Sequence, residues 1–262
     1  MSDISPTSVF SGPWPPSASA ASIEGVRLNV ATLEDAVAEA VARAGAGRGF
    51  TFFTFNLDHL AKIGRDLAFR AVYLRATLVT ADGWPIAWLA ARQGARVERV
   101  CGSDLVVPLC SAAAVSGLPV GFIGPRAAAQ ADGIAAVKAK APRLKVAFAE
   151  APEFGGEPRG PEIAAMAERL AASQVRLCFV CLGAPKQELL ADALAKLCPE
   201  IGFLCVGAAL DFLGGHAVRA PEWAQAYKLE WAWRLAHEPR RLGKRYAEAA
   251  LAFGRAVTGL WG

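Results

Sequence analysis

An apolar run in this chain is followed at once by glycine and proline. The run at 177–182, Leu-Cys-Phe-Val-Cys-Leu, is short enough for a buried strand, and Gly183 and Pro185 end it before a helical pattern begins. Proline is tolerated in the first turn of a helix, because its missing N–H would have no partner there. The stretch therefore predicts a strand, a tight turn and a helix. Three polar residues lie at the start of that helix: Lys186, Gln187 and Glu188.

The same order of strand, polar turn and helix recurs along the chain. Further strands are expected at 26–30, 51–55, 77–80, 120–123, 145–148 and 201–206. Helical patterns are expected at 32–44, 84–91, 105–115 and 162–172. Two further helices are expected, one from the polar residues after 55 to about 73 and one from after Pro125 to about 140. This alternation predicts an α/β fold with a Rossmann-like, mainly parallel sheet and helices on both faces.

The length and composition fit one large α/β domain or two small ones, since 54% of the 262 residues are hydrophobic. We expect a disordered lead at 1–22, an α/β domain at 23–218 and a helical appendage at 219–262. The lead is rich in Ser, Pro and Ala, lacks a basic start, and does not resemble a secretory signal. No apolar run approaches the ~18 residues that a spanning helix needs.

Charge, cysteine usage and missing motifs exclude several classes of function. A net charge of +4 is too small to predict a nucleic-acid partner. Cys178 and Cys181 have C-x-x-C spacing, but they lie inside an apolar run where side chains alternate, so we interpret them as core residues of a cytosolic protein with reduced thiols. His59, His216 and His237 lack the spacing of a zinc helix. The sequence also lacks an Asp-x-Asp pair, a Walker loop and a dinucleotide fingerprint, and it predicts no metal and no cofactor.

Polar residues follow the expected strands, and the carboxyl ends of parallel strands meet at one edge of a sheet. Helix N-termini at that edge offer N–H groups to an anion. The residues expected there are Thr54, Asn56, Asp82, Arg99, Asp104, Lys186, Gln187, Glu188 and Asp211. Plainer interpretations stay open: Asp82 is followed by glycine as in many turns, Asp211 can be a satisfied core carboxylate, and Lys186 can be a solvated surface residue.

The composition changes from Arg219 onward. The segment 219–262 holds four of the seven tryptophans, and the stretch from Arg234 to Arg245 holds five Lys and Arg residues against one Glu. Basic, Trp-containing amphipathic helices suit a membrane interface or an anionic ligand. The alternative is a pair of C-terminal helices that pack on the domain with a solvated basic face.

Several ordered motifs together resemble the WecG/TagA/CpsF family of bacterial glycosyltransferases, over about 26–246. The motifs are Thr-Phe-Asn at 54–56, Ala-Asp-Gly at 81–83, Arg-Val-Cys-Gly-Ser-Asp at 99–104, Gly-Ala-Pro-Lys-Gln-Glu at 183–188, Gly207 through Asp211 to Gly214, Arg-Ala-Pro at 219–221, Glu-Trp-Ala-Trp-Arg at 230–234 and Glu-Pro-Arg-Arg at 238–241. The resemblance implies an inverting, metal-independent enzyme of exopolysaccharide or cell-envelope polymer synthesis. Such an enzyme moves a sugar from a UDP-sugar to an undecaprenyl-pyrophosphate-linked saccharide, and it is peripheral on the inner face of the cytoplasmic membrane.

The resemblance also implies roles for single residues. Asp82 matches the general base, and Thr54, Asn56, Arg99 and Gln187 match residues that line its pocket. The C-terminal residues match an appendage that closes over the pocket at the membrane, with cationic side chains near the pyrophosphate. In this chain these are Arg234, Arg241 and either Lys244 or Arg245. The sugar, the acceptor saccharide and the oligomeric state, including a possible homo-oligomer, stay open.

Two other classes of function compete with the transferase. One is a non-catalytic nucleotide- or phosphate-binding partner in polysaccharide assembly, which would not need a base at Asp82. The other is a nicotinamide-dependent oxidoreductase, which shares the layered sheet but requires the glycine fingerprint that this sequence lacks.

Overall fold

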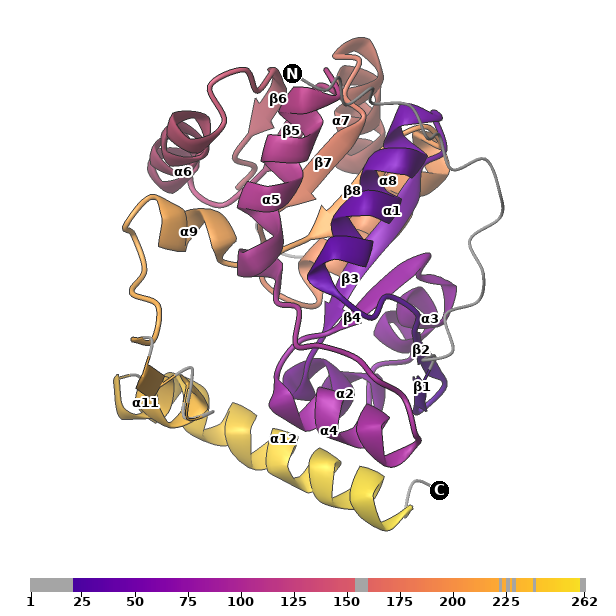
Figure 1. Cartoon of the computed structure of the whole chain (residues 1–262), viewed down its shortest axis with the longest axis vertical. Coiled ribbons are helices and arrows are strands. Elements are labelled where there is room, and N and C mark those ends of the chain that lie inside the picture. Colours follow the sequence, from indigo (N-terminus) through magenta and orange to yellow (C-terminus); the bar gives the residue numbers. More distant parts are fainter. Residues whose placement is uncertain are drawn as a thin grey trace, which may run out of the picture.

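The core is a six-stranded parallel sheet in the order β4-β3-β8-β7-β5-β6 (Figure 1). The computed structural model describes residues 21–153, 160–221, 223–224, 227, 230–237 and 239–259. The strands are β3 (Phe50–Phe55), β4 (Leu78–Ala81), β5 (Val120–Ile123), β6 (Val146–Glu150), β7 (Leu177–Val180) and β8 (Gly202–Cys205). The predicted α/β fold with a parallel sheet is confirmed.

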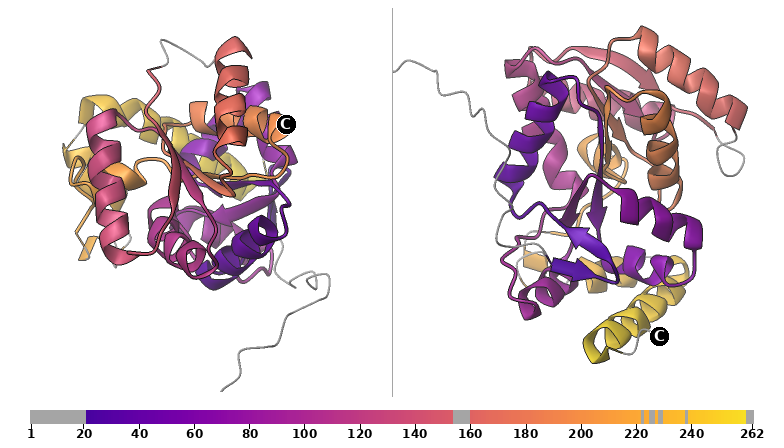
Figure 2. Two further views of the ribbon diagram at one scale, coloured as in Figure 1. Left: turned by 90° about the horizontal axis from the view of Figure 1, so that it is seen from above. Right: turned by 90° about the vertical axis from the view of Figure 1, so that its right-hand side faces the viewer.

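The strands are apolar throughout because helices cover the sheet on both faces (Figure 2). Every residue of β3, β4, β5, β7 and β8 is buried, and only the edge strand β6 is partly exposed. One face carries α1 (Leu33–Gly45), α5 (Gly102–Val115), α6 (Ala127–Lys140) and α9 (Ala209–Leu213). The other carries α2 (Leu57–Ile63), α3 (Leu67–Arg75), α7 (Gly160–Ala172) and α8 (Lys186–Leu197).

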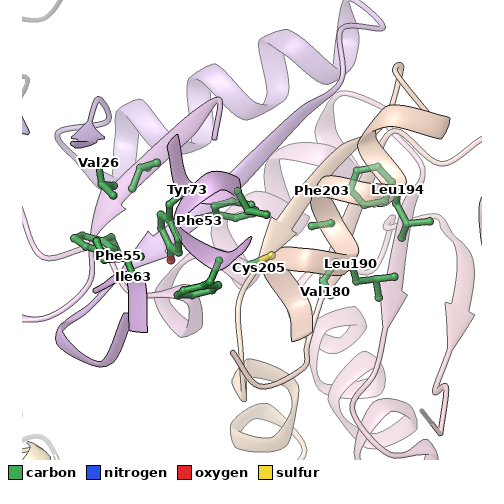
Figure 3. Packing of buried hydrophobic residues seen from close by; sticks show 14 of the residues in the cluster. Val26, Phe53, Phe55, Ile63, Tyr73, Val180, Leu190, Leu194, Phe203 and Cys205 are labelled. Atoms are coloured by element: carbon green, nitrogen blue, oxygen red, sulfur yellow. The ribbon is translucent and has the colours of Figure 1, made fainter. Parts of the chain in front are cut away.

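Neighbouring strand residues point to opposite faces and divide the core in two. Phe53 and Phe203 pack with Leu190 of α8 in one cluster, which Figure 3 shows. Phe52 and Leu204 belong to the second cluster, on the side of α1 and α5.

Three local features differ from the sequence-based expectation. The single helix expected to about residue 73 is two helices, because the chain turns at Gly64 and the Asp66 side chain then caps α3 by accepting a hydrogen bond from the Phe69 N–H at 2.9 Å. A short hairpin, β1 (Ala21–Ile23) with β2 (Val26–Leu28), overlaps the last two residues of the expected lead. The short helix α9 follows β8, in a stretch for which the sequence predicted no helix.

The C-terminal segment crosses the end of the molecule where β3 and β4 end (Figure 1). It contains α11 (Glu230–His237) and α12 (Pro239–Thr258), and α12 packs on α2 and on α4 (Trp84–Arg92). Two ion pairs join α12 to the α2 region: Arg245 Nε to Asp58 Oδ1 at 2.9 Å, and Arg65 Nη1 to Glu248 Oε2 at 2.7 Å. No described helix is both long and apolar enough to cross a membrane.

Candidate active site

The parallel register of β3 and β4 places Asp82 beside Thr54 and Asn56. Phe55 pairs with Ala81, so the residues that follow each strand emerge side by side. The Asp82 Oδ2 atom accepts hydrogen bonds from Thr54 Oγ1 at 3.4 Å and from Asn56 Nδ2 at 3.3 Å. Burial raises the pKa of Asp82 above its ordinary value, and hydrogen bonds from Cys101 and Asn56 partly oppose that rise. The site therefore contains a carboxyl group that is more basic than a solvated aspartate.

The residue after Asp82 shapes the start of α4. Gly83 has a φ of 99°, a conformation that side-chain-bearing residues rarely adopt, and it precedes the first turn of the helix. In the Asp-Gly pair, Gly83 is therefore the residue that forms the turn. The Asp82 carboxyl group points instead to the hydrogen-bonded cluster with Thr54 and Asn56.

A polar cavity of about 760 Å³ lies along the carboxyl ends of the strands. Asp82, Thr54 and Gln187 line it, together with Gly183 after β7 and Gly207 after β8. A Cβ atom on either glycine would meet no atom within 4 Å, so the backbone of both residues faces open space. This wall can approach a bulky ligand closely, as glycine-rich turns do at phosphate sites.

The polar cavity is also lined by ionisable side chains from the start of α6 and from the α9 region. Arg126 precedes α6, and Asp211 and His216 lie on or just after α9. His216 Nε2 lies 2.8 Å from Asp132 Oδ2. Burial raises the pKa of Asp211, while Arg126 and His216 act in the opposite direction. Asp211 therefore lines the cavity in a charged surrounding.

An apolar cavity of about 750 Å³ lies between α4 and the appendage. Its aromatic lining consists of Trp84, Trp88, Trp231, Tyr246 and Phe253. The Phe253 ring centroid lies 6.0 Å from that of Trp84 and 5.6 Å from that of Trp88. The aromatic rings of α4 and α12 thus form the wall of one compartment.

The two cavities meet at Asp82. Residues that line both are Asn56, Asp82, Glu230, Arg245 and Tyr246. The carboxyl groups of Asp82 and Glu230 and the guanidinium group of Arg245 therefore lie where a polar compartment meets an apolar one.

The basic residues expected in the appendage have different places. Arg245 lines both cavities and pairs with Asp58, whereas Lys244 is exposed and lines neither. Arg234 lies in α11 and Arg241 in α12, but their side chains fall outside the described part of the structure. Of the two residues considered for the third basic role, only Arg245 faces the cavities.

Two other residues expected at the site, Asp104 and Lys186, lie outside both cavities. Asp104 joins Arg99 and Arg219, with Oδ2 3.4 Å from Arg99 Nη2 and Oδ1 2.6 Å from Arg219 Nη2. Arg99 lines the apolar cavity, but Asp104 lines neither cavity, and neither does the half-buried Lys186. Asp104 thus links the start of the appendage to the arginine near Asp82.

Glu188 is completely buried and also lines neither cavity. Its Oε1 atom accepts a hydrogen bond from Gln187 Nε2 at 2.8 Å. Burial raises the pKa of Glu188 from 4.5 to about 7, against the effect of this hydrogen bond. The fold therefore disfavours the ionised form of this carboxyl group.

This burial predicts a pH-dependent stability difference between the parent and Glu188→Gln. Because the pKa is raised on folding, burial of the carboxyl group does not lower the free energy of unfolding below about pH 4.5. Above that pH the free energy of unfolding falls until the pH passes about 7. The free energy of unfolding of the parent minus that of the variant should fall by roughly 3 kcal/mol over that range. Urea unfolding at pH 4 and pH 8 measures it, and an unchanged difference would show that the carboxyl group is not desolvated.

The structure adds residues that sequence reasoning missed. Cys101 hydrogen-bonds Asp82 and lines the polar cavity, because a bridge between Ala81 and Arg99 brings its segment beside β4. His59 and Arg126 line the same cavity. Their position after strands β3 and β5 was a signal that could have identified His59 and Arg126. Cys101 lies in the motif at 99–104, but no role was assigned to it.

Among the described residues, no group of three or more His, Cys, Asp or Glu side chains is placed to hold a metal ion.

The model of one protein family, described as Glycosyl transferase WecG/TagA/CpsF family, matches residues 21–261 of this chain.

Proposed function

The chain belongs to the WecG/TagA/CpsF family of glycosyl transferases, and we propose that it is an inverting enzyme that uses a UDP-sugar. The acceptor is an undecaprenyl-pyrophosphate-linked saccharide in exopolysaccharide or cell-envelope polymer synthesis. The transfer takes place at the inner face of the cytoplasmic membrane, with the enzyme bound peripherally.

One observation carries the proposal: the Asp82 carboxyl group lines both cavities. A glycosyl transfer needs a base that can reach the acceptor hydroxyl while that oxygen attacks the anomeric carbon of the donor. A carboxylate between a donor compartment and an acceptor compartment has that position. Its raised pKa makes it a stronger base than a solvated aspartate.

The polar cavity is the proposed donor site. Its volume of about 760 Å³ is within the usual range for small-molecule sites. The open backbone at Gly183 and Gly207 suits a diphosphate, and Arg245 at the junction can stabilise the charge of the departing UDP. In this arrangement protein cations take the place of a divalent metal ion.

Metal independence predicts that a chelator leaves the rate unchanged. We expect the rate of transfer with excess EDTA to equal the rate with added Mg²⁺ or Mn²⁺, because the charge of the diphosphate is balanced by protein groups. Initial rates of UDP release under both conditions test this. A rate that collapses in EDTA and returns with metal would contradict it.

The apolar cavity is the proposed site for the lipid-linked acceptor. Its aromatic walls suit the first units of a polyprenyl chain, while Arg99 and Arg245 on its lining suit a pyrophosphate. Trp84, Trp88 and Trp231 are exposed to between 36% and 48%, so part of each ring is free to contact a ligand or the membrane interface.

Trp88→Ala is expected to weaken use of the lipid acceptor. Loss of this indole from the apolar cavity should raise the KM for a polyprenyl-linked acceptor about tenfold and change kcat little. The KM for an acceptor with a short, water-soluble chain should stay near that of the parent. Leu251→Ala is the matched control, since Leu251 is exposed on α12 and lines neither cavity. Equal effects on both acceptors would place the lipid elsewhere.

The direct test is a screen of UDP-sugars with a lipid-pyrophosphate-linked acceptor, with release of UDP and formation of the glycolipid as readouts. The proposal expects at least one donor to give acceptor-dependent UDP release. Tight binding of nucleotide without release on any donor and acceptor pair would favour the non-catalytic binding partner.

A further inference from the structure

The Gln187 side chain is held at both ends of its amide group. Its Oε1 atom accepts a hydrogen bond from the Gly207 N–H at 3.0 Å, and its Nε2 atom donates to Glu188 Oε1 at 2.8 Å. Gln187 is only 3% exposed, yet it lines the polar cavity. The amide therefore spans the gap between the start of α8 and the end of β8 in a fixed orientation.

Glu188 is the buried anchor of this arrangement. It is 0% exposed, and its Oε2 atom has no hydrogen-bond partner among the described residues. His59 Nε2 lies 3.9 Å from Oε1, and burial lowers the pKa of His59 to about 3, so the imidazole is neutral at neutral pH. A carboxyl group with an unpartnered oxygen is costly to bury, and it contributes little to stability for that cost.

The imidazole beside Glu188 is itself fixed. His59 Nδ1 lies 2.7 Å from the Tyr73 hydroxyl oxygen, and Tyr73 packs against Phe53 and Phe55 in the core that Figure 3 shows. Because burial lowers the pKa of His59 and raises that of Tyr73, the imidazole and the phenol are both neutral, and the phenol donates to Nδ1. A rigid, neutral cluster thus backs the carboxyl group and limits its movement.

We propose that Glu188 is a positioning residue for glycosyl transfer, which fixes the Gln187 amide so that its second N–H donates to an oxygen of the bound donor. A glutamine amide has two N–H donors, and the Glu188 bond uses one of them. Without that acceptor, the amide can rotate or turn its oxygen to the ligand. The role does not depend on ionisation, since Oε1 accepts a hydrogen bond in both forms of the acid.

This assignment changes the expectation from the sequence, which placed Glu188 among the substrate-binding residues. The carboxyl group is behind the cavity wall, so it acts through Gln187. The inference rests on the proposed transferase function, because Gln187 must contact the donor for its orientation to matter.

A double-mutant cycle tests the inference in the full-length enzyme with the UDP-sugar that the parent uses. Gln187→Ala and Glu188→Met should each lower kcat/KM for the donor, by between about tenfold and hundredfold. The double variant should lose no more than Gln187→Ala alone, because both changes remove the same interaction. Losses that multiply in the double variant would overturn the inference.

Two further readouts separate positioning from a structural role. Methionine is an unbranched apolar side chain that fills much of the space of a buried carboxylic acid, so the melting temperature of Glu188→Met should equal or exceed that of the parent while its activity falls. Glu188→Gln keeps an acceptor oxygen and should restore kcat/KM to within about threefold of the parent. Activity of Glu188→Gln as low as that of Glu188→Met would contradict the proposal.

If Glu188→Met does not fold, the inference can be tested by NMR on the parent enzyme. The side-chain amide of Gln187, identified by its loss from the NMR spectrum of Gln187→Ala, should exchange slowly with D₂O and shift on addition of UDP. Exchange at the rate of a free amide would overturn the inference. A parent that turns over no UDP-sugar would instead refute the proposed function, so the two failures are distinguishable.

Discussion

Asp82→Asn is expected to lower the rate of glycosyl transfer by about 10²–10⁴-fold. The amide keeps the size of the side chain, but it cannot take the proton of the acceptor hydroxyl. The Kd for UDP should stay within a few-fold of that of the parent, because the proposed diphosphate contacts are the backbone of Gly183 and Gly207 and the Arg245 side chain. Initial rates of acceptor-dependent UDP release, together with calorimetric titration of UDP, measure both effects.

The pH dependence of the rate gives an independent check on Asp82. The base must be ionised, so the rate of the parent should fall as the pH is lowered through the raised pKa of Asp82. This acid limb should be missing from the residual activity of Asp82→Asn. Asp192→Asn is the control for the loss of a carboxylate, since Asp192 pairs with Arg75 and Lys196 away from both cavities. If the rate of transfer by Asp82→Asn equals that of the parent, Asp82 is not the general base.

Arg245→Ala is expected to lower the rate of transfer by about 10²-fold, because it removes the cation at the junction of the two cavities. Lys244→Ala is the matched control: it removes an equal charge from the neighbouring, exposed position and should leave the rate near that of the parent. Arg245→Lys should restore only part of the activity, because an ammonium group lacks the planar fork of a guanidinium group.

Loss of Arg245 should not by itself unfold the appendage. Asp58 keeps Lys62 as an ion-pair partner, and the pair of Arg65 and Glu248 still joins α12 to the α2 region. The melting temperature of Arg245→Ala should therefore remain close to that of the parent. Equal losses of activity in Arg245→Ala and Lys244→Ala would point to the total charge of the appendage, and would contradict a specific contact.

The regular part of the fold follows from patterns in the sequence, because buried parallel strands are apolar at every position and turns carry glycine or proline. The features that differed depend on weaker local signals. Gly64 ends α2 within an otherwise helical pattern, and the hairpin at the start of the domain is too short to have a clear period. The helix α9 has only five residues, fewer than a periodic pattern needs.

Convergence of polar residues at one sheet edge could also be predicted, because parallel strands direct their ends to the same side. The sequence could not separate residues that line a cavity from residues behind its wall. Gln187 and Glu188 are adjacent and both polar, yet one faces the cavity and the other faces the core. That difference depends on how α8 is rotated against β8, which tertiary packing decides. The roles of these residues in catalysis stay predictions.

In the proposed complex, the donor sugar is held with its anomeric carbon facing Asp82, at the junction of the two cavities. A crystal structure of Asp82→Asn with a UDP-sugar tests it most directly. We expect the diphosphate to lie along Gly183 and Gly207, with space for one acceptor hydroxyl between the sugar and residue 82. A sugar bound against Arg126 and His216, with its anomeric carbon turned away from residue 82, would contradict this arrangement.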